Sequence, residues 1–221
     1  MREVKVLTKI LKANDMIAAE NRALFDSYGI CCINLMSSPG AGKTTLLEKT
    51  SEMLPKSISI AAVEGDVATS LDAERLKAAG IPTVQVNTGG GCHLDAGMIK
   101  NALEYLDLRN TGLLFVENVG NLICPSSFDL GEHHRIVMLS IAEGHDKPLK
   151  YPGMFMSCEA MILSKTDLLG KCNFDLSAGK ESALKVNPRL RIFELSSVEG
   201  AGMQEWVKYL EELVREKKKG R

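Results

Sequence analysis

The chain has 221 residues, of which 45% are hydrophobic and 25% are charged, so it carries enough apolar side chains for a full folded core. Its 27 Lys and Arg residues against 28 Asp and Glu residues give a formal net charge of -1, which argues against a general nucleic-acid or membrane-surface binder. No apolar run reaches the ~18 residues of a membrane span, and the first residues show no secretory signal pattern. We therefore expect a cytoplasmic protein that binds neither nucleic acid nor membrane.

Apolar strand-like segments alternate with amphipathic helix-like segments along the chain. Helices are expected at about 7–28, 43–54, 70–79, 94–108 and 203–217. Strands are expected at 30–36, 57–63, 81–86, 113–116, 136–141, 161–163 and 191–195. This alternation is typical of a parallel sheet covered on both faces. The sequence predicts an α/β fold with a mostly parallel central sheet, forming a single domain over residues 1–221 that includes the N-terminal helix.

The segment 37–45 (S-S-P-G-A-G-K-T-T) lies between a predicted strand and a predicted helix. It matches the phosphate-binding Walker A pattern, except that a serine replaces the first glycine. Gly40 and Gly42 let the backbone curl around an anion, and the helix that follows points its positive dipole end at the phosphates. Lys43 can reach the β and γ oxygens, and Thr44 can ligate Mg²⁺. The pattern predicts a P-loop NTPase that holds a nucleotide with Gly40, Ala41, Gly42, Lys43, Thr44 and Thr45.

Acidic partners for the magnesium ion should lie at the carboxyl ends of other strands. Asp66 and Glu117 each end a predicted strand, and we expect them to hold Mg²⁺ together with Thr44. Asp72 stands at the start of a predicted helix, where a favourable charge at the helix N-terminus explains it equally well. We predict that Lys43, Thr44, Asp66 and Glu117 form the catalytic group.

The segment 161–167 (M-I-L-S-K-T-D) is an apolar strand followed by S-K-T-D, where GTPases carry N-K-x-D. The carboxylate of Asp167 can accept both the N1 and N2 donors of guanine, a pairing that adenine does not offer. The stem of Lys165 would lie over the base, while Ser164 replaces the asparagine that braces the loop. Ser197 follows the next strand, where GTPases place a backbone donor to the base. The residues favour GTP and GDP as ligands.

Two loops carry thiols that the sheet topology can bring together. Cys92 and His93 follow three glycines that permit an irregular backbone, and Cys124 lies on the same connection as Glu117. Two thiolates and an imidazole suit Ni²⁺ or Zn²⁺. The spacing matches no standard zinc-finger pattern, so on the residues alone these could also be structural side chains. Three ligands per chain would leave one coordination position open, or would allow a site that two chains share.

Taken in this order, the segments resemble the HypB family of hydrogenase nickel-incorporation GTPases, which is related to UreG within a metal-regulated group of GTPases. Three stretches carry the resemblance most specifically. They are residues 34–45 (N-L-M-S-S-P-G-A-G-K-T-T), 117–122 (E-N-V-G-N-L) and 146–152 (D-K-P-L-K-Y-P). The resemblance extends from about residue 13 to the C-terminus. A UreG-like chain would show Cys-Pro-His, whereas this chain has Cys92 next to His93 and adds Cys124.

The resemblance implies a GTP-hydrolysing metallochaperone that helps to insert nickel into NiFe-hydrogenase. HypB proteins dimerise with GTP bound, and they bind Ni²⁺ or Zn²⁺ at the dimer interface through residues matching Cys92, His93 and Cys124. The residue matching Lys150 reaches the nucleotide of the other chain. The implied partners are a HypA-like nickel chaperone and the hydrogenase large subunit.

The mechanism and two alternatives follow from these residues. Asn121 stands where Ras-like enzymes place a water-positioning glutamine, so hydrolysis should be slow in the isolated protein. A shift of the Glu117 loop on hydrolysis would move Cys124 and couple nucleotide state to metal affinity. The first alternative is a P-loop kinase or ATPase that shares only the phosphate loop. The second is a metal-storage module in which the nucleotide is structural.

Overall fold

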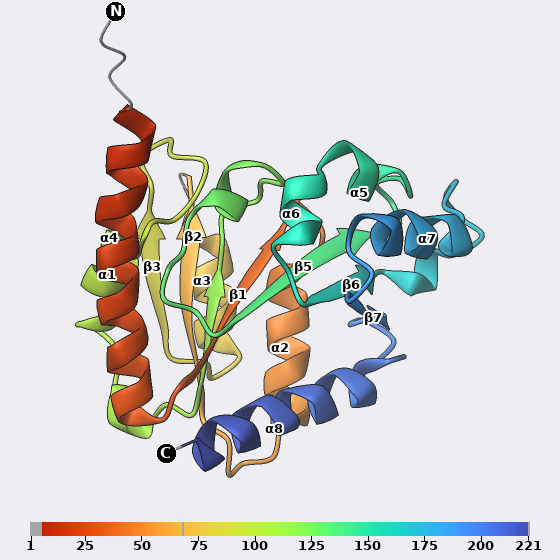
Figure 1. Cartoon of the computed structure of the whole chain (residues 1–221). Coiled ribbons are helices and arrows are strands. Elements are labelled where there is room, and N and C mark those ends of the chain that lie inside the picture. Colours follow the sequence, from red (N-terminus) through yellow and green to blue (C-terminus); the bar gives the residue numbers. More distant parts are fainter. Residues whose placement is uncertain (1–5, 68, 221) are drawn as a thin grey trace, which may run out of the picture.

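The computed structural model describes residues 6–67 and 69–220, which form a seven-stranded sheet between two layers of helices (Figure 1). The strand order is β3-β2-β4-β1-β5-β6-β7, and each strand runs parallel to its neighbours. The strands are β1 (Cys31–Ser37), β2 (Ile60–Asp66), β3 (Thr83–Asn87), β4 (Leu113–Glu117), β5 (His134–Ser140), β6 (Ala160–Ser164) and β7 (Arg191–Glu194). The predicted α/β class and its parallel sheet are confirmed.

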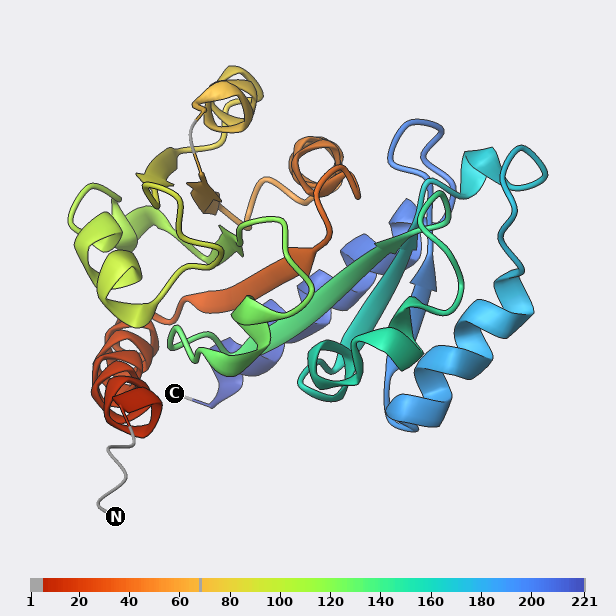
Figure 2. The ribbon, with the colours of Figure 1, turned by 90° about the horizontal axis from the view of Figure 1, so that it is seen from above.

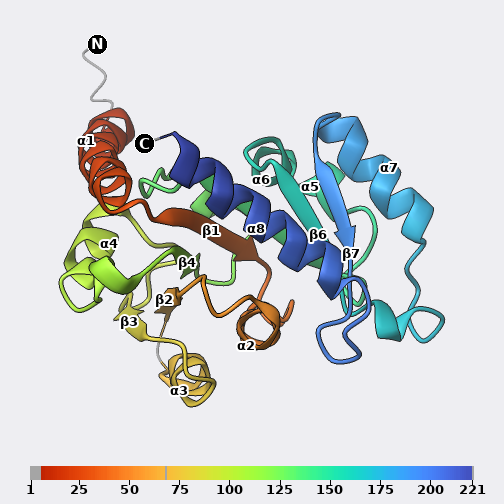
Figure 3. The same cartoon turned by 90° about the horizontal axis from the view of Figure 1, so that it is seen from below.

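Eight α-helices occur in the described residues, and they cover both faces of the sheet (Figures 2 and 3). Three short 3-10 turns, η1 (Leu108–Asn110), η2 (Cys124–Ser127) and η3 (Thr166–Leu168), lie in the connections. The helices are α1 (Val6–Tyr28), α2 (Lys43–Met53), α3 (Leu71–Ala78), α4 (Ala96–Leu103), α5 (Lys147–Lys150), α6 (Pro152–Met156), α7 (Leu176–Val186) and α8 (Met203–Lys219).

The alternation of side chains along β1 divides the core between the two faces of the sheet. Every residue of β1 is buried, as expected for a central strand of a parallel sheet. Ile33 belongs to the apolar cluster that α2, α3 and α8 cover. Cys32 points to the opposite face and packs in the cluster beneath α1 and α4, while Met36 joins the cluster beneath α6 and α7. The apolar character of β1 therefore follows from contacts on both sides.

The predicted strands and helices are all present, and most of their ends are shifted by one to three residues. The predicted strand at 57–63 begins only at Ile60, and the predicted helix at 94–108 ends at Leu103 and is followed by η1. Asp107 caps η1 with hydrogen bonds from the backbone N–H groups of Arg109 and Asn110. Three helices had no prediction, namely α5, α6 and α7. Two of them are single turns that begin around prolines, and short turns carry too few residues for a helical periodicity to emerge.

The sheet brings the candidate residues to one edge. β4 pairs with one side of β1 and β5 pairs with the other side. The strand order therefore reverses at β1. In open α/β sheets, ligands bind beside the carboxyl ends of the strands at such a point. The phosphate loop follows β1, and the other candidate loops follow β2, β3, β4, β6 and β7. Within the described residues, no helix has both the length and the apolar content needed to cross a membrane.

Candidate functional site

The phosphate loop has the curled backbone that its glycines predict. Gly40 and Gly42 have φ angles of 73° and 99°, in the left-handed region that glycine adopts readily, and α2 begins directly after Gly42. The Nζ atom of Lys43 donates a hydrogen bond to Ser37 Oγ at 3.1 Å. The serine that replaces the first glycine of the pattern therefore anchors the lysine inside the loop. The first turn of α2 leaves backbone N–H groups free to bind an anion.

Glu117 and Asp66 reach the cavity beside the phosphate loop by different routes. Thr44 Oγ1 donates to Glu117 Oε1 at 2.9 Å, which joins the phosphate loop to the end of β4. Asp66 lines the same cavity, and its carboxylate accepts hydrogen bonds from the backbone N–H groups of Val67 and Thr69. Lys43 also lines this cavity. The structure thus brings together all four residues predicted as the catalytic group.

Two buried glutamates give this cavity an unusual electrostatic character. Burial raises the pKa of Glu117 to about 7, against the opposing effects of Lys43 and Thr44. Burial, together with the nearby charges of Glu117 and Asp66, raises the pKa of Glu64 to about 8. Glu64 had no predicted role, although it lies two residues before Asp66 near the end of the same strand. Carboxylate and hydroxyl oxygens are the ligands that Mg²⁺ prefers, so the donors present here fit this ion.

The S-K-T-D loop forms one wall of a second pocket, directly against the phosphate loop. Ser164 Oγ donates to the carbonyl of Ala41 at 2.8 Å, so the serine still braces the loop that an asparagine would brace in the common pattern. Lys165 Nζ donates to the carbonyl of Gly40 at 2.6 Å. Lys165 has a φ of 61°, the one positive value among the described residues other than glycine. The pocket is lined by Ala41, Gly42, Thr45, Ser164, Lys165, Asp167, Ser197 and Val198.

Ser196, which the sequence analysis passed over, holds the key carboxylate of this pocket. Ser196 is fully buried, and its Oγ donates to Asp167 Oδ1 at 2.6 Å. The hydrogen bond fixes the orientation of the carboxylate, and both oxygens keep lone pairs with which to accept from a ligand. Thr45 and Ser197 line the pocket as predicted. No local pattern in the sequence marks this contact, because Ser196 and Asp167 lie 29 residues apart.

The two thiol-bearing loops meet. One ligand atom from each of Cys92, His93 and Cys124 lies within 4.8 Å of the others. Both cysteines are free and half-buried. The imidazole of His93 stacks on Phe128, with ring centroids 3.8 Å apart, and burial lowers its pKa, which favours the neutral form that binds metal. The left-handed φ angles of Gly89 and Gly90 provide the irregular backbone that adjacent ligands require.

Asn118 connects the phosphate side of the edge to the thiol side. It directly follows Glu117, and its Oδ1 accepts a hydrogen bond at 3.2 Å from the backbone N–H of Leu94, the residue after His93. Its Nδ2 donates to Asn34 in β1 at 3.1 Å, and Asn118 is buried. The loop that carries Cys92 and His93 is therefore hydrogen-bonded to Asn118, the residue after Glu117.

The β4 loop also contacts the phosphate loop through its backbone. A Cβ atom placed on Gly120 would lie 2.8 Å from the backbone of Pro39, so only glycine permits this approach. Asn121, the residue after it, accepts hydrogen bonds from the N–H groups of Ile123 and Cys124 through Oδ1. The Asn121 side chain thus stabilises the turn that carries Cys124, and its Oδ1 atom is used there and not for orienting a water molecule.

Lys150 lies apart from the two cavities. It belongs to the single-turn helix α5, where it is exposed and forms an ion pair with Asp146 at 2.6 Å. In the part of the chain that the structure describes, Lys150 lines neither the cavity beside the phosphate loop nor the pocket of the S-K-T-D loop. Its predicted role toward the nucleotide of a second chain stays a prediction.

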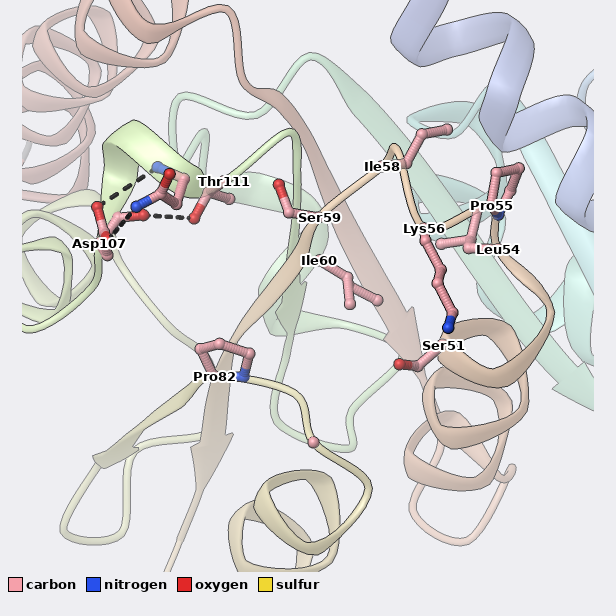
Figure 4. A pocket seen from close by; sticks show the side chains of 12 residues that line it. Ser51, Leu54, Pro55, Lys56, Ile58, Ser59, Ile60, Pro82, Asp107 and Thr111 are labelled. Atoms are coloured by element: carbon pink, nitrogen blue, oxygen red, sulfur yellow. Dashed lines mark hydrogen bonds between the residues drawn. The ribbon is translucent and has the colours of Figure 1, made fainter.

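A separate hollow lies at the opposite edge of the sheet, near the start of β2 and the end of α2 (Figure 4). Its lining is mainly aliphatic and hydroxyl-bearing, and the charged members are Lys56 and Asp107. Besides the two backbone N–H groups that cap η1, the carboxylate of Asp107 accepts a hydrogen bond from Asn110 Nδ2 at 2.6 Å. This hollow is distinct from the site that the sequence predicts.

A phosphate loop at the switch point of a parallel sheet, joined to a base-recognition loop, defines a P-loop nucleotide-binding protein. Residues 31–194 match the model of the CobW/HypB/UreG nucleotide-binding domain. The chain belongs to this family and, within it, to the HypB group. It is 51% identical over 210 residues to the hydrogenase maturation factor HypB of Azotobacter chroococcum, a match that covers 95% of this chain and 69% of the relative.

Two solved structures of HypB proteins are similar to this chain over most of its length. One is HypB from Helicobacter pylori in complex with nickel, with 43% identity, a TM-score of 0.88, and coverage of 92% of this chain and 96% of the other. The second is the hydrogenase maturation factor HypB from Archaeoglobus fulgidus, with 38% identity, a TM-score of 0.86, and coverage of 92% and 100%. The predicted family and the P-loop fold are thereby confirmed.

Proposed function

We propose that this protein is a GTP-hydrolysing metallochaperone that helps to insert nickel into NiFe-hydrogenase. The observation that carries the proposal is the juxtaposition of a phosphate loop and a Cys/His cluster at one sheet edge, connected through Asn118. The relatives named hydrogenase maturation factors, and the relative solved with nickel, support the same reading. We place the protein in the cytoplasm.

GTP hydrolysis would use the group formed by Lys43, Thr44, Asp66 and Glu117. Mg²⁺ would be held by Thr44, Asp66 and Glu117 and would offset the negative charge of the phosphates. The backbone of residues 40–45 cradles the phosphate oxygens, and Lys43 stabilises charge that develops on the transferred group. Because Asn121 is occupied in holding the turn before Cys124, we expect the reaction, which yields GDP and phosphate, to be slow in the isolated protein.

Guanine would be selected by Asp167. Its carboxylate is oriented by Ser196 and can accept both guanine donors, while the stem of Lys165 crosses the phosphate loop toward the base position. Ser197 offers a backbone donor from the opposite wall. These contacts favour GTP over ATP, and they set the proposal apart from a P-loop kinase or ATPase.

Nickel is the cargo in this proposal, and Cys92, His93 and Cys124 are its ligands. The same donors accept Zn²⁺, so both ions belong to the proposal. Three ligands leave the coordination incomplete in one chain, and a second chain could complete it. We therefore propose a homodimer in the GTP-bound state, with Lys150 approaching the partner's nucleotide. A HypA-like nickel chaperone would deliver the metal, and the hydrogenase large subunit would receive it.

The hydrogen bonds at Asn118 provide a route by which nucleotide and metal affect each other. Glu117 senses Thr44 in the nucleotide site, and Asn118 holds the backbone that follows His93. A displacement of Glu117 on hydrolysis would therefore be passed to the metal ligands on both loops. By thermodynamic linkage, nickel would change nucleotide affinity by the same factor as nucleotide changes nickel affinity.

Light scattering combined with analysis of bound nickel tests the proposal in one experiment. The protein is measured without nucleotide, with GDP and with a non-hydrolysable GTP analogue. We expect a dimer with the GTP analogue, a monomer with GDP, and a nickel affinity that differs between the two states. A preference for ATP would point to the kinase or ATPase class. Equal nickel affinity in all three states, with no hydrolysis in the dimer, would point to a storage module.

A further inference from the structure

Glu64 and Glu117 lie side by side at the ends of two neighbouring strands. They are paired in the register of β2 and β4, and only 2% and 3% of their surfaces are exposed. Among the described residues, neither Glu64 Oε2 nor Glu117 Oε2 has a hydrogen-bond partner. Glu117 has the Thr44 hydroxyl on its other oxygen. Two buried carboxylates thus each present an unpartnered oxygen, and both line the cavity beside the phosphate loop.

Such an arrangement is costly unless a cation completes it. Burying a carboxylate oxygen without a partner costs free energy, and two adjacent carboxylates repel each other. The lining of this cavity carries an excess of acidic groups over basic ones. Its charged members are Lys43, Glu64, Asp66, Asp72 and Glu117.

A purely structural carboxylate looks different in this protein. Glu132 is buried to a similar degree, but it accepts hydrogen bonds from the side chains of Asn34 and Arg135 and from the backbone N–H of Leu130. Asp72 lines the same cavity as Glu64, but it is exposed enough to be solvated and forms an ion pair with Arg75. Glu64 lines the cavity and combines deep burial with an unpartnered carboxylate oxygen, so packing alone does not explain it.

We propose that Glu64 is a further protein ligand of the magnesium centre, binding the ion or one of its water molecules beside Glu117. The inference rests on the proposed function, because it takes the nucleotide-bound Mg²⁺ as the cation. Mg²⁺ keeps several waters and is held by few carboxylates, which suits a site where Glu117 accepts a hydrogen bond from Thr44 and Glu64 is its neighbour in the strand register. Glu64 is a positioning residue in this proposal, since it acts on the phosphates only through the ion.

The test uses the full chain and the Glu64→Gln variant, and it measures metal binding and stability rather than turnover. Mn²⁺ serves as the spectroscopic probe, titrated into the GDP complex and followed by electron paramagnetic resonance. We expect Mn²⁺ affinity to fall at least tenfold in Glu64→Gln, while GDP affinity in EDTA stays within about threefold of the unaltered chain. We also expect the metal-free variant to unfold at a higher temperature, because the repulsion with Glu117 is removed.

Two further variants keep the test decisive. Glu64→Asp retains the charge on a shorter side chain, and its Mn²⁺ affinity should lie between those of the other two proteins. Glu132→Gln, also a buried glutamate, should lower the unfolding temperature and leave Mn²⁺ affinity unchanged. Unchanged Mn²⁺ affinity in both Glu64 variants would overturn this inference and leave the proposed function standing. Failure of the unaltered chain to bind GDP with Mn²⁺ would overturn both.

Discussion

Replacing Asp167 with alanine removes the carboxylate that we propose selects guanine. In the structure this carboxylate is held by Ser196 at 2.6 Å and faces the pocket beside the phosphate loop. A hydrogen bond to a charged group contributes about 1.5–3 kcal/mol net, so losing two of them costs about 3–6 kcal/mol. Val198, which is 79% exposed, leaves the outer wall of the pocket open to water. Water can therefore replace some of the lost hydrogen bonds, and we expect a loss of binding free energy in the lower half of the ~3–6 kcal/mol range.

A loss of about 3–4 kcal/mol corresponds to a fall in GDP affinity of roughly 150-fold to 1000-fold. Calorimetric titration of Asp167→Ala with GDP and ADP measures it directly, and the preference for GDP over ADP should disappear. Asp175→Ala is a matched control, since Asp175 caps α7 through the N–H of Ala178 and lies outside the pocket. If Asp167→Ala binds GDP within threefold of the unaltered chain, or if that chain prefers ADP, guanine recognition by this loop is refuted.

Four further outcomes follow from contacts described above. Asn118→Ala should keep GDP affinity within about threefold of the unaltered chain. In nickel titrations, it should at least halve the effect of a GTP analogue on nickel affinity. An unchanged effect would show that Asn118 does not couple the two sites. Cys124→Ser should weaken nickel binding at least tenfold with nucleotide affinity unaltered, and equal nickel affinity would exclude Cys124 as a ligand. The pKa of Glu64 is raised from 4.5 to about 8, so the folded state holds an extra proton between these values. Metal-free protein should therefore lose stability by roughly 3–5 kcal/mol as pH rises through that window, and urea unfolding should show a flatter profile for Glu64→Gln; identical profiles would contradict this. Trp206→Phe should cost about 1–2 kcal/mol in urea unfolding, because Nε1 donates to buried Thr50 at 2.9 Å, and a change below about 0.5 kcal/mol would count against that bond.

The fold followed from the sequence because strand and helix periods alternate over long segments. The apolar run that became β1 is buried on both faces, and the glycines of the phosphate loop take the left-handed angles that they permit. The single-turn helices α5 and α6 escaped prediction because each holds too few residues to establish a period. α7 escaped although Asp175 caps it, because Gly179 in its middle reads as a helix breaker, whereas the structure uses it for close contact with Phe174.

The candidate site was predictable in its ligands but not in its supporting contacts. Lys43, Asp167 and Cys92 stand in motifs whose chemistry is recognisable one segment at a time. Asn118 and Ser196 act across the sheet edge on loops far away in sequence, and no local pattern records such pairings. Their partners depend on strand order, which the sequence leaves open. The assigned roles of the site residues, and the extent of the single domain, remain predictions.

The close approach of Gly120 to Pro39 has a mechanical consequence. A Cβ built on Gly120 would lie within 2.9 Å of Pro39 Cα, N and Cγ, and the rigid ring of Pro39 has no free rotamers with which to absorb a small displacement. Because this contact is tight, a displacement of the phosphate loop should be passed on to the turn that carries Cys124. After rapid mixing with nucleotide, we expect the two loops to change conformation with the same time constant. A methyl group on Gly120 would push the two loops apart, so Gly120→Ala should disturb both of them together.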